Sequence, residues 1–289
     1  MNGNIVIANQ KLRAEIAPLG AELVRLSDST GADWLHDGDP AWWSGRAPLL
    51  FPMVGRATGD RIRVDGKLYP LPQHGFARRS VFSAVIAEPA RAVLRLEADN
   101  ATRAQFPFAF RLDLAFAVDA ETLNIVATVA NADDRPMPFA FGYHPAFRWP
   151  LPGATGAHEL RFEKSEPAPI RRLADGLLDP REFPNPAVSG VLALDAGLFE
   201  DGALIFDQLY SRRVAFGPPG GPELAVSFPG MPHFGLWTKP GGAPFLCLEP
   251  WQGFAAPLGF DGEFSERPGV VALAPGEERR FVMDVTIRK

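Results

Sequence analysis

The chain has 289 residues, of which 46% are hydrophobic and 22% charged, an ordinary globular balance with enough apolar material for a large core. The 29 Lys and Arg against 34 Asp and Glu give a net charge of -5 without any basic run, which argues against nucleic acid as the main partner. A single cysteine, Cys247, excludes an internal disulfide framework and favours a reducing compartment.

Targeting and membrane signals are not expected in this sequence. Residues 1–17 contain no basic region followed by a continuous apolar stretch, so they do not resemble a secretion signal. The longest apolar run near the start, Ala47–Val54, contains two prolines and is too short to span a membrane. We therefore expect a cytoplasmic protein with no membrane partner.

Apolar and polar residues alternate with period two from end to end, and 28 Gly with 29 Pro indicate many turns. Both features favour an all-β chain. In chain order the alternation predicts strands at Asn4–Ala8, Leu12–Ala17, Glu22–Ser27, Val81–Ala87, Ala92–Glu97, Leu112–Val118, Leu123–Val129, Ala203–Phe206, Arg213–Phe216, Leu224–Phe228, Phe245–Glu249 and Phe281–Ile287.

The organisation of these strands indicates one unit. A short polar turn separates Leu112–Val118 from Leu123–Val129, which predicts an antiparallel hairpin. Short helices are expected only at Asp99–Gln105 and Ala196–Asp201. Alternation resumes on both sides of each proline-rich segment, so we expect a single domain over residues 1–289. So many strands must cover one another face to face, which predicts a large antiparallel β-sandwich.

One histidine, His144, lies in the aromatic stretch Phe139–Phe147, which reads FAFGYHPAF. Its imidazole is either a hydrogen-bonded core group or an acid held in a dry cleft. His74 stands before Gly75, where the missing side chain lets a backbone approach a ligand closely.

The other histidines have less distinctive surroundings. His36 and His158 lie in polar stretches and are expected to be solvated. His233 lies between a proline and a phenylalanine, and both a rim and a core position are open for it.

Glu249 follows a run of apolar residues and precedes Pro-Trp, where a charge is costly unless it is paired or functional. An apolar wall would raise the pKa of its carboxyl and make a better base near neutral pH. The alternative is a loop cap or an ion pair with an arginine.

Arg56 also ends an apolar run, and it suits either sugar hydroxyls or a buried ion pair. Asp207 follows the predicted strand Ala203–Phe206 directly, where aspartate often only forms a turn.

Other enzyme motifs are missing from the sequence. It contains no G-x-S-x-G elbow, phosphate loop, H-E-x-x-H or C-x-x-C pattern. His74, His144 and Glu249 could together hold a metal, but no closely spaced ligand pair supports this. Only one carboxylate has a convincing setting, which counts against a hydrolase with paired carboxylates.

Five stretches in order, taken together, resemble the aldose 1-epimerase family of galactose mutarotase-like β-sandwich proteins over nearly the whole chain. These are APLLFPMVGRATGDRI, YPLPQHGFARR, FGYHPAF, ALIFDQL and FLCLEPWQG. The resemblance implies that a histidine protonates the ring oxygen of a cyclic sugar while a glutamate takes the proton of the anomeric hydroxyl.

Matched motif by motif, the resemblance makes His144 the acid and Glu249 the base. It implies that Arg56, His74 and Asp207 bind the sugar. It also implies that neither a metal nor an organic cofactor is needed. With unperturbed pKa values, the charged pair of imidazolium and carboxylate would be the population between the two pKa values.

Departures from the family pattern bear on the substrate. HPAF replaces the Asn-His-x-Tyr-Phe block of galactose mutarotases and is closer to a less characterised bacterial branch. HGFAR is also similar to hexose-6-phosphate mutarotases, which hold a phosphate with further arginines. Arg78 and Arg79 are available, although two arginines after a turn are commonly solvated.

We therefore expect an enzyme acting on an aldose or a sugar phosphate, as a monomer or homodimer. The alternative is a sugar-binding or regulatory module that keeps the fold without turnover.

Overall fold

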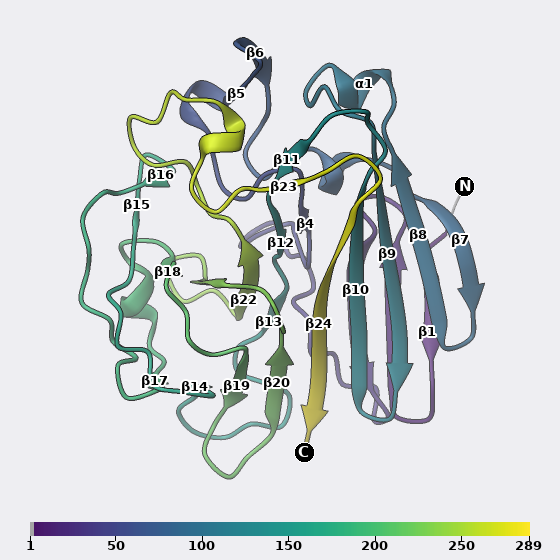
Figure 1. The fold of residues 1–289 in the computed structure, drawn as a ribbon. Coiled ribbons are helices and arrows are strands. Elements are labelled where there is room, and N and C mark those ends of the chain that lie inside the picture. Colours follow the sequence, from purple (N-terminus) through teal and green to yellow (C-terminus); the bar gives the residue numbers. More distant parts are fainter. Residues whose placement is uncertain (1–2) are drawn as a thin grey trace.

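The computed structural model describes residues 3–289, and its largest element is a nine-stranded antiparallel sheet (Figure 1). The strands lie in the order β17 (Val191–Ala193), β14 (Glu159–Phe162), β19 (Arg213–Gly217), β20 (Glu223–Ser227), β24 (Glu278–Arg288), β10 (Thr122–Asn131), β9 (Phe110–Asp119), β8 (Arg91–Glu97) and β7 (Ser83–Glu88).

A second, six-stranded sheet holds the residues of interest for function. Its order is β18 (Leu204–Phe206), β21 (His233–Trp237), β22 (Phe245–Gln252), β12 (Phe141–Tyr143) and β4 (Leu49–Leu50), and β13 (Ala146–Arg148) also pairs with β22.

Smaller elements complete the chain. The N-terminal strands β1 (Ile5–Ala8), β2 (Leu12–Ala17) and β3 (Glu22–Asp28) form a sheet of their own. The remaining strands pair two by two: β5 (Arg61–Val64) with β6 (Lys67–Pro70), β11 (Met137–Phe139) with β23 (Val271–Leu273), and β15 (Leu173–Ala174) with β16 (Leu177–Leu178). The helical turns are α1 (Asn100–Arg103) and the 3-10 turns Thr58–Asp60, Ala77–Arg79, Ala196–Phe199 and Phe264–Glu266.

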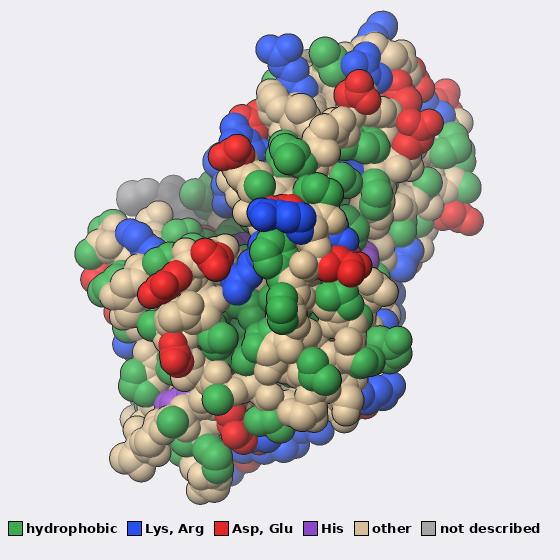
Figure 2. Space-filling model, turned by 90° about the vertical axis from the view of Figure 1, so that its left-hand side faces the viewer, with side chains coloured by type: hydrophobic (Ala, Val, Ile, Leu, Met, Phe, Trp, Pro, Cys, Tyr) green, Lys and Arg blue, Asp and Glu red, His purple; other side chains and the backbone are tan. Residues whose placement is uncertain are grey.

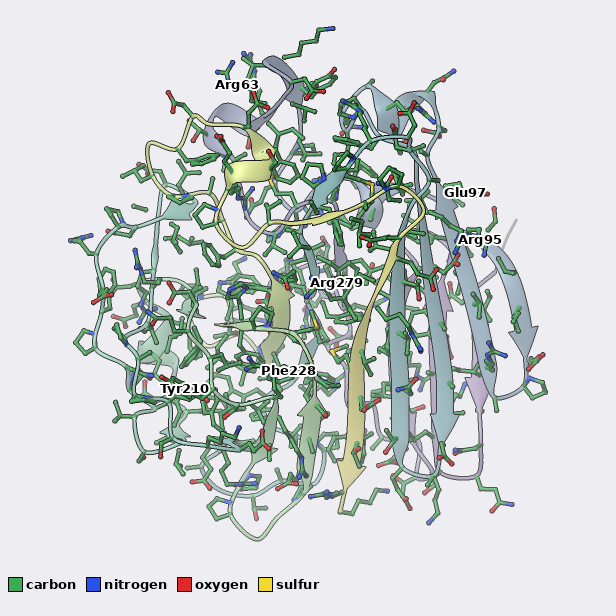
Figure 3. The ribbon with its side chains drawn as sticks, in the orientation of Figure 1. Arg63, Arg95, Glu97, Tyr210, Phe228 and Arg279 are labelled. Carbon is green, nitrogen blue, oxygen red and sulfur yellow. The ribbon has the colours of Figure 1, made fainter. Side chains whose placement is uncertain are left out.

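The core lies on the inner face of the large sheet, where alternate residues are apolar. In β9 and β10 every second side chain is buried, and the register pairs Phe116 with Ile125. Side chains fill the space between the large sheet and the elements that face it (Figure 3). Phe281 of β24 stacks on Phe141 of β12 with ring centroids 4.8 Å apart, which joins the two sheets.

Tyr143 fixes the position of the smaller sheet relative to the larger one. Its buried hydroxyl accepts a hydrogen bond from the N–H of Ala127 (3.0 Å) and donates one to the C=O of Phe281 (2.8 Å). Successive side chains of a strand point to opposite faces. Because Tyr143 points toward the large sheet, His144 points away from it, into the opposite face of the smaller sheet.

Most of the predicted strands are confirmed, and so is the all-β fold built of large antiparallel sheets. The predicted hairpin is β9–β10. The two expected helices are present but shorter, as α1 with the Asp99 capping box and as the 3-10 turn at Ala196–Phe199. No helix within residues 3–289 combines the length and apolar character that a membrane crossing requires.

Two expectations about strands and histidines were wrong. Glu249 does not end its strand, because β22 continues through Pro250 to Gln252 and is buried throughout. His36 and His158 are buried rather than solvated. The Nε2 of His36 lies 2.9 Å from the C=O of Trp43, and the ring of His158 accepts a hydrogen bond from the N–H of Leu151. The polar neighbours of these two histidines in the sequence wrongly suggested that they are exposed to solvent.

Acidic and basic side chains are interspersed on the face shown in Figure 2. An example elsewhere is the ion pair of Arg95 (β8, labelled in Figure 3) with Asp113 (β9), whose Nε and Oδ1 lie 2.6 Å apart.

Candidate functional site

The register of the smaller sheet places His144 directly opposite Glu249. Gly142 of β12 pairs with Trp251 of β22, and Ala146 of β13 pairs with Cys247. The position halfway between these pairs matches His144 with Glu249. Opposed residues on one face have Cβ atoms about 4.5–5.5 Å apart, so the two side chains meet without any loop to position them.

The other neighbour of Glu249 across the sheet is Gly235 of β21, which in turn pairs with Ile205 of β18. Neither residue puts a polar side chain beside the carboxyl. The site is therefore a row across β18, β21 and β22 to His144, which stands between β12 and β13, and only Glu249 and His144 in this row are ionisable.

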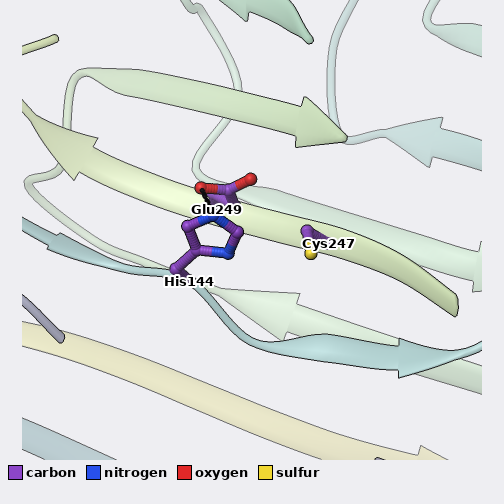
Figure 4. Close-up of side chains that lie close together, drawn as sticks. All are labelled: His144, Cys247 and Glu249. Carbon is purple, nitrogen blue, oxygen red and sulfur yellow. Dashed lines mark ion pairs between the residues drawn. The ribbon is translucent and has the colours of Figure 1, made fainter. Parts of the chain in front are cut away.

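The two side chains are in contact (Figure 4) and are almost completely buried. The Nε2 of His144 lies 3.2 Å from the Oε2 of Glu249, and the side chains are 9% and 2% exposed. The contact is an ion-pair contact without aligned hydrogen-bond geometry, and the Nδ1 of His144 has no hydrogen-bond partner either. The rings of Trp43 and Trp237 pack on the imidazole at centroid distances of 5.0 and 5.9 Å.

Burial shifts both pKa values toward the neutral forms. Loss of water lowers the pKa of His144 from 6.5 to about 3. Loss of water also raises the pKa of Glu249 well above 4.5, and the neighbouring Trp251 opposes that shift. The expected population of imidazolium and carboxylate is therefore disfavoured in the empty site. The pair still holds one mobile proton, because a neutral imidazole with a carboxylic acid contains as many protons as the ion pair.

His74 lies in a strained turn beside this pair. Its backbone has φ 66°, and Gly75 has φ 70°. A Cβ at Gly75 would lie 2.2 Å from the C=O oxygen of Phe51, so only glycine fits. The Nδ1 of His74 accepts the N–H of Gly55 at 3.1 Å, which places the proton of the neutral ring on Nε2. Burial lowers the pKa of His74 well below 6.5, and the proximity of the His144 ring and of the Arg78 guanidinium adds to the shift.

A cavity of about 390 Å³ opens onto the pair. His74, His144 and Glu249 all line it, so the structure brings together three of the five predicted site residues. Its other walls are Trp43, Val54, Gly55, Gln73, Arg78, Leu173, Ala203, Ile205, Trp237, Trp251 and Ala255. The volume falls within the range of small-molecule sites. A separate cavity of about 440 Å³ beside Phe264 has no histidine or glutamate among its described lining residues.

Trp251 was missed by the sequence reasoning. Its indole lies across the sheet between two glycines, because a Cβ at Gly142 or Gly235 would come within 2.5 and 2.3 Å of its ring atoms. The buried indole N–H makes no hydrogen bond of normal geometry, although it lies close enough to the carboxyl of Glu249 to oppose the rise in that pKa. A buried donor that lines a cavity and lacks a partner is suited to a polar ligand. The two glycines indicate space for the indole only when the pairing of the strands is known, so the sequence alone could not identify Trp251.

Arg78 also differs from expectation. It was expected to be solvated, but it is half-buried, and it lines the cavity. Burial lowers the pKa of its guanidinium. Arg79 is exposed, as expected.

Arg56 and Asp207 are not among the residues that line the cavity. The Nε of Arg56 lies 2.8 Å from the Oδ1 of Asp60 in a partly exposed ion pair, and Glu249 is not its partner. Asp207 follows Ile205 by two positions, so it emerges on the same face of the sheet. Its Oδ1 is buried without a hydrogen-bond partner, and Arg171 lies 3.8 Å from its Oδ2.

Within residues 3–289, the group of side chains that could hold a metal ion is His144, Cys247 and Glu249. It differs from the combination with His74 that the sequence raised.

Comparison with known proteins gives the same fold and the same family. A family model described as aldose 1-epimerase matches residues 4–286. The chain belongs to the aldose 1-epimerase family. Among curated proteins, it is similar to the plasmid-encoded protein LacX of Lactococcus lactis subsp. lactis, with 27% identity over 98% of this chain and 99% of that one.

Two solved structures of galactose mutarotase-type proteins superpose on nearly the whole chain. A galactose mutarotase-related enzyme from Lactobacillus acidophilus has a TM-score of 0.90 at 27% identity and covers 99% of this chain and 97% of its own. A galactose mutarotase-like protein from Lactobacillus casei has a TM-score of 0.91 at 27% identity and covers 99% and 100%. Membership of the aldose 1-epimerase family supports an isomerase-type enzyme that acts on a sugar.

Proposed function

We propose that this protein is an aldose 1-epimerase that interconverts the α and β anomers of an aldose, with His144 as acid and Glu249 as base. The observation behind the proposal is the buried pair, opposed in register at the cavity wall with Nε2 and Oε2 3.2 Å apart. One acid and one base on a single sugar suffice for mutarotation, and each positioned group contributes roughly 10²–10⁴-fold in rate. The proposal treats residues 1–289 as one functional unit.

The proton count of the pair suits ring opening. In that step Glu249 takes the proton of the anomeric hydroxyl while the N–H of His144 protonates the ring oxygen. The step starts from imidazolium and carboxylate and ends with a neutral imidazole and a carboxylic acid. Burial favours these neutral forms, so the site stabilises the stage at which the open-chain aldehyde is free to rotate about C1–C2. Reclosure returns both protons, and the pair needs no exchange with water.

The cavity walls fit a sugar. Tryptophan combines a large apolar face with a polar N–H, and Trp43, Trp237 and Trp251 line the cavity. The Nε2 of His74 carries the ring proton and lies 3.3 Å from the side-chain amide of Gln73, which lines the same cavity. We propose that this Nε2–H and the indole N–H of Trp251 bind sugar oxygens. Arg78 supplies the cationic side chain of the cavity and would favour an aldose carrying an acidic group.

The test is anomer interconversion of freshly dissolved α-sugars, followed by polarimetry or NMR. Glucose, galactose, xylose and glucose 6-phosphate are each measured with the wild type and with Glu249→Gln. An acceleration that the variant loses would support the epimerase and define its sugar class. Calorimetric binding of a sugar without any acceleration would instead support a non-catalytic sugar-binding module.

Arg56 and Asp207 remain predictions as outer sugar-binding residues. Arg56→Met and Asp207→Asn measure their roles through KM in the same assay. Unchanged KM values in both variants would remove them from the site.

A further inference from the structure

The only cysteine of the sequence lies beside the acid–base pair. Residues two apart along a strand share a face, so Cys247 and Glu249 of β22 project from the same side of the sheet. Cys247 pairs with Ala146 and with Trp237, which are two residues from His144 and from Gly235 respectively. Figure 4 shows the three side chains together. One ligand atom from each of His144, Cys247 and Glu249 lies within 4.8 Å of the others.

The polar atoms of this group lack hydrogen-bond partners. The Nδ1 of His144 and the Oε2 of Glu249 are buried without one, and the thiol of Cys247 is completely buried. Buried polar atoms without partners carry a desolvation cost of about 1–3 kcal/mol each. A metal cation that accepts electron pairs from the Oε2 of Glu249, the thiol sulfur and the Nε2 of His144, which faces that oxygen, would remove the cost of the unpaired carboxyl oxygen.

We propose that His144, Cys247 and Glu249 form a binding site for a soft divalent cation such as Zn²⁺ or Cd²⁺. Imidazole and thiolate select such ions. Mg²⁺ and Ca²⁺ require about six or more oxygen ligands, whereas this group offers a single carboxylate. Two negative ligands also balance a divalent charge, so the occupied site is neutral in its buried setting.

The geometry fits a tetrahedral ion with a small adjustment. Bonds of about 2.3 Å to sulfur and about 2.0–2.2 Å to nitrogen and oxygen place ligand atoms roughly 3.5 Å apart. The Nε2 and Oε2 atoms are already 3.2 Å apart, and the sulfur has to approach them by no more than about 1.3 Å. The cavity provides access, because His144 and Glu249 line it. It also leaves a fourth position for water or a sugar hydroxyl.

An ion held here would occupy the atoms that are proposed to transfer protons. It would therefore inhibit anomer interconversion and compete with the aldose. This consequence rests on the proposed function, whereas the binding of the ion does not.

The test is a titration of the chelator-treated full chain with Cd²⁺, followed by the ultraviolet sulfur-to-cadmium charge-transfer band. Because Cys247 is the only thiol, the band reports on this site alone. One saturating equivalent is expected for the wild type and no band for Cys247→Ser. Zn²⁺ measured by calorimetry should bind at least about tenfold more weakly to Cys247→Ser and to His144→Asn, the lower limit seen for losing even an outer partner of a metal ligand. Mg²⁺ is the control and should produce no change.

The absence of a band in the wild type, or Zn²⁺ affinity equal in Cys247→Ser and the wild type, would overturn the proposal. Should Cys247→Ser fail to fold, His144→Asn decides it, because that variant keeps the thiol and loses one ligand. If the wild type accelerates mutarotation, Zn²⁺ should slow it and a chelator should restore it. If it accelerates nothing, the band still decides whether the metal site exists.

Discussion

Replacing Glu249 by glutamine separates catalysis from folding at this site. The amide has nearly the same shape as the carboxyl and keeps an oxygen beside the Nε2 of His144. It cannot take a proton from a sugar hydroxyl. The loss of one positioned base predicts a fall in kcat of roughly 10²–10⁴-fold. This corresponds to a rise of about 3–5 kcal/mol in the activation free energy.

The same substitution should not destabilise the protein. The carboxyl is 2% exposed, and burial raises its pKa well above 4.5, so its charged form costs free energy in the folded state. A neutral amide avoids that cost. The free energy of unfolding at pH 8 should therefore be equal to or higher than that of the wild type.

Polarimetry of a reactive α-anomer gives kcat and KM, and chemical denaturation gives stability. We expect kcat to fall while KM and stability stay close to wild-type values. Activity within threefold of the wild type would refute the role of Glu249 as base. A parallel loss of activity and stability would show that the carboxyl is needed for the structure instead.

Three further predictions follow from the site. Burial lowers the pKa of His144 to about 3, so the contribution of His144 to the free energy of unfolding rises with pH. Burial raises the pKa of Glu249, so the contribution of Glu249 falls with pH. The two slopes cancel between about pH 4.5 and 6.5, the reference values, where folded and unfolded pairs hold one proton each. The double variant with His144→Asn and Glu249→Gln isolates these slopes from those of the buried His74 and His233, whose pKa values burial also lowers. The free energy of unfolding of the wild type relative to this variant should fall on both sides of the window by up to about 1.4 kcal/mol per pH unit, and a difference that does not change with pH would contradict the pairing. Trp251→Phe keeps an aromatic ring between the two glycines but removes the N–H. The free energy of sugar binding or of activation should become less favourable by about 1–3 kcal/mol, while the free energy of unfolding changes little. Wild-type kinetics would show that the indole N–H binds nothing. Gly75→Ala should destabilise the protein by about 1–3 kcal/mol and raise KM, because the methyl group meets a backbone oxygen and displaces His74, and wild-type thermal stability would exclude that strain.

The sequence predicted what depends on local periodicity. Alternation in β9, β10 and β24 located the large sheet, because a sheet with one buried face requires apolar residues at every second position. The motif blocks around His144 and Glu249 were sufficient to select both residues before their contact was known.

What sequence reasoning missed depends on pairing between distant segments. β12 and β13 are three residues long and have too few residues to show a period. Pro250 suggested that β22 ends at Glu249. The strand continues past the proline, because Pro250 still pairs with Phe234 of the neighbouring strand β21. The position of Arg78 at the cavity also depends on tertiary packing, since nothing in its local sequence distinguishes it from Arg79. Pairing of this kind has no local signal.

The site is therefore a property of register. Glu249, Gly235 and Ile205 come from β22, β21 and β18, and His144 lies between β12 and β13, which both pair with β22, so the strand pairing aligns the four residues. A shift of one residue in β22 would turn Glu249 to the opposite face, because side chains alternate along a strand. The large glycine-flanked indole of Trp251 and the bond of Tyr143 to the neighbouring sheet act against such a shift. In this fold the contact of His144 with Glu249 depends on the residues that set the register as well as on the two side chains themselves.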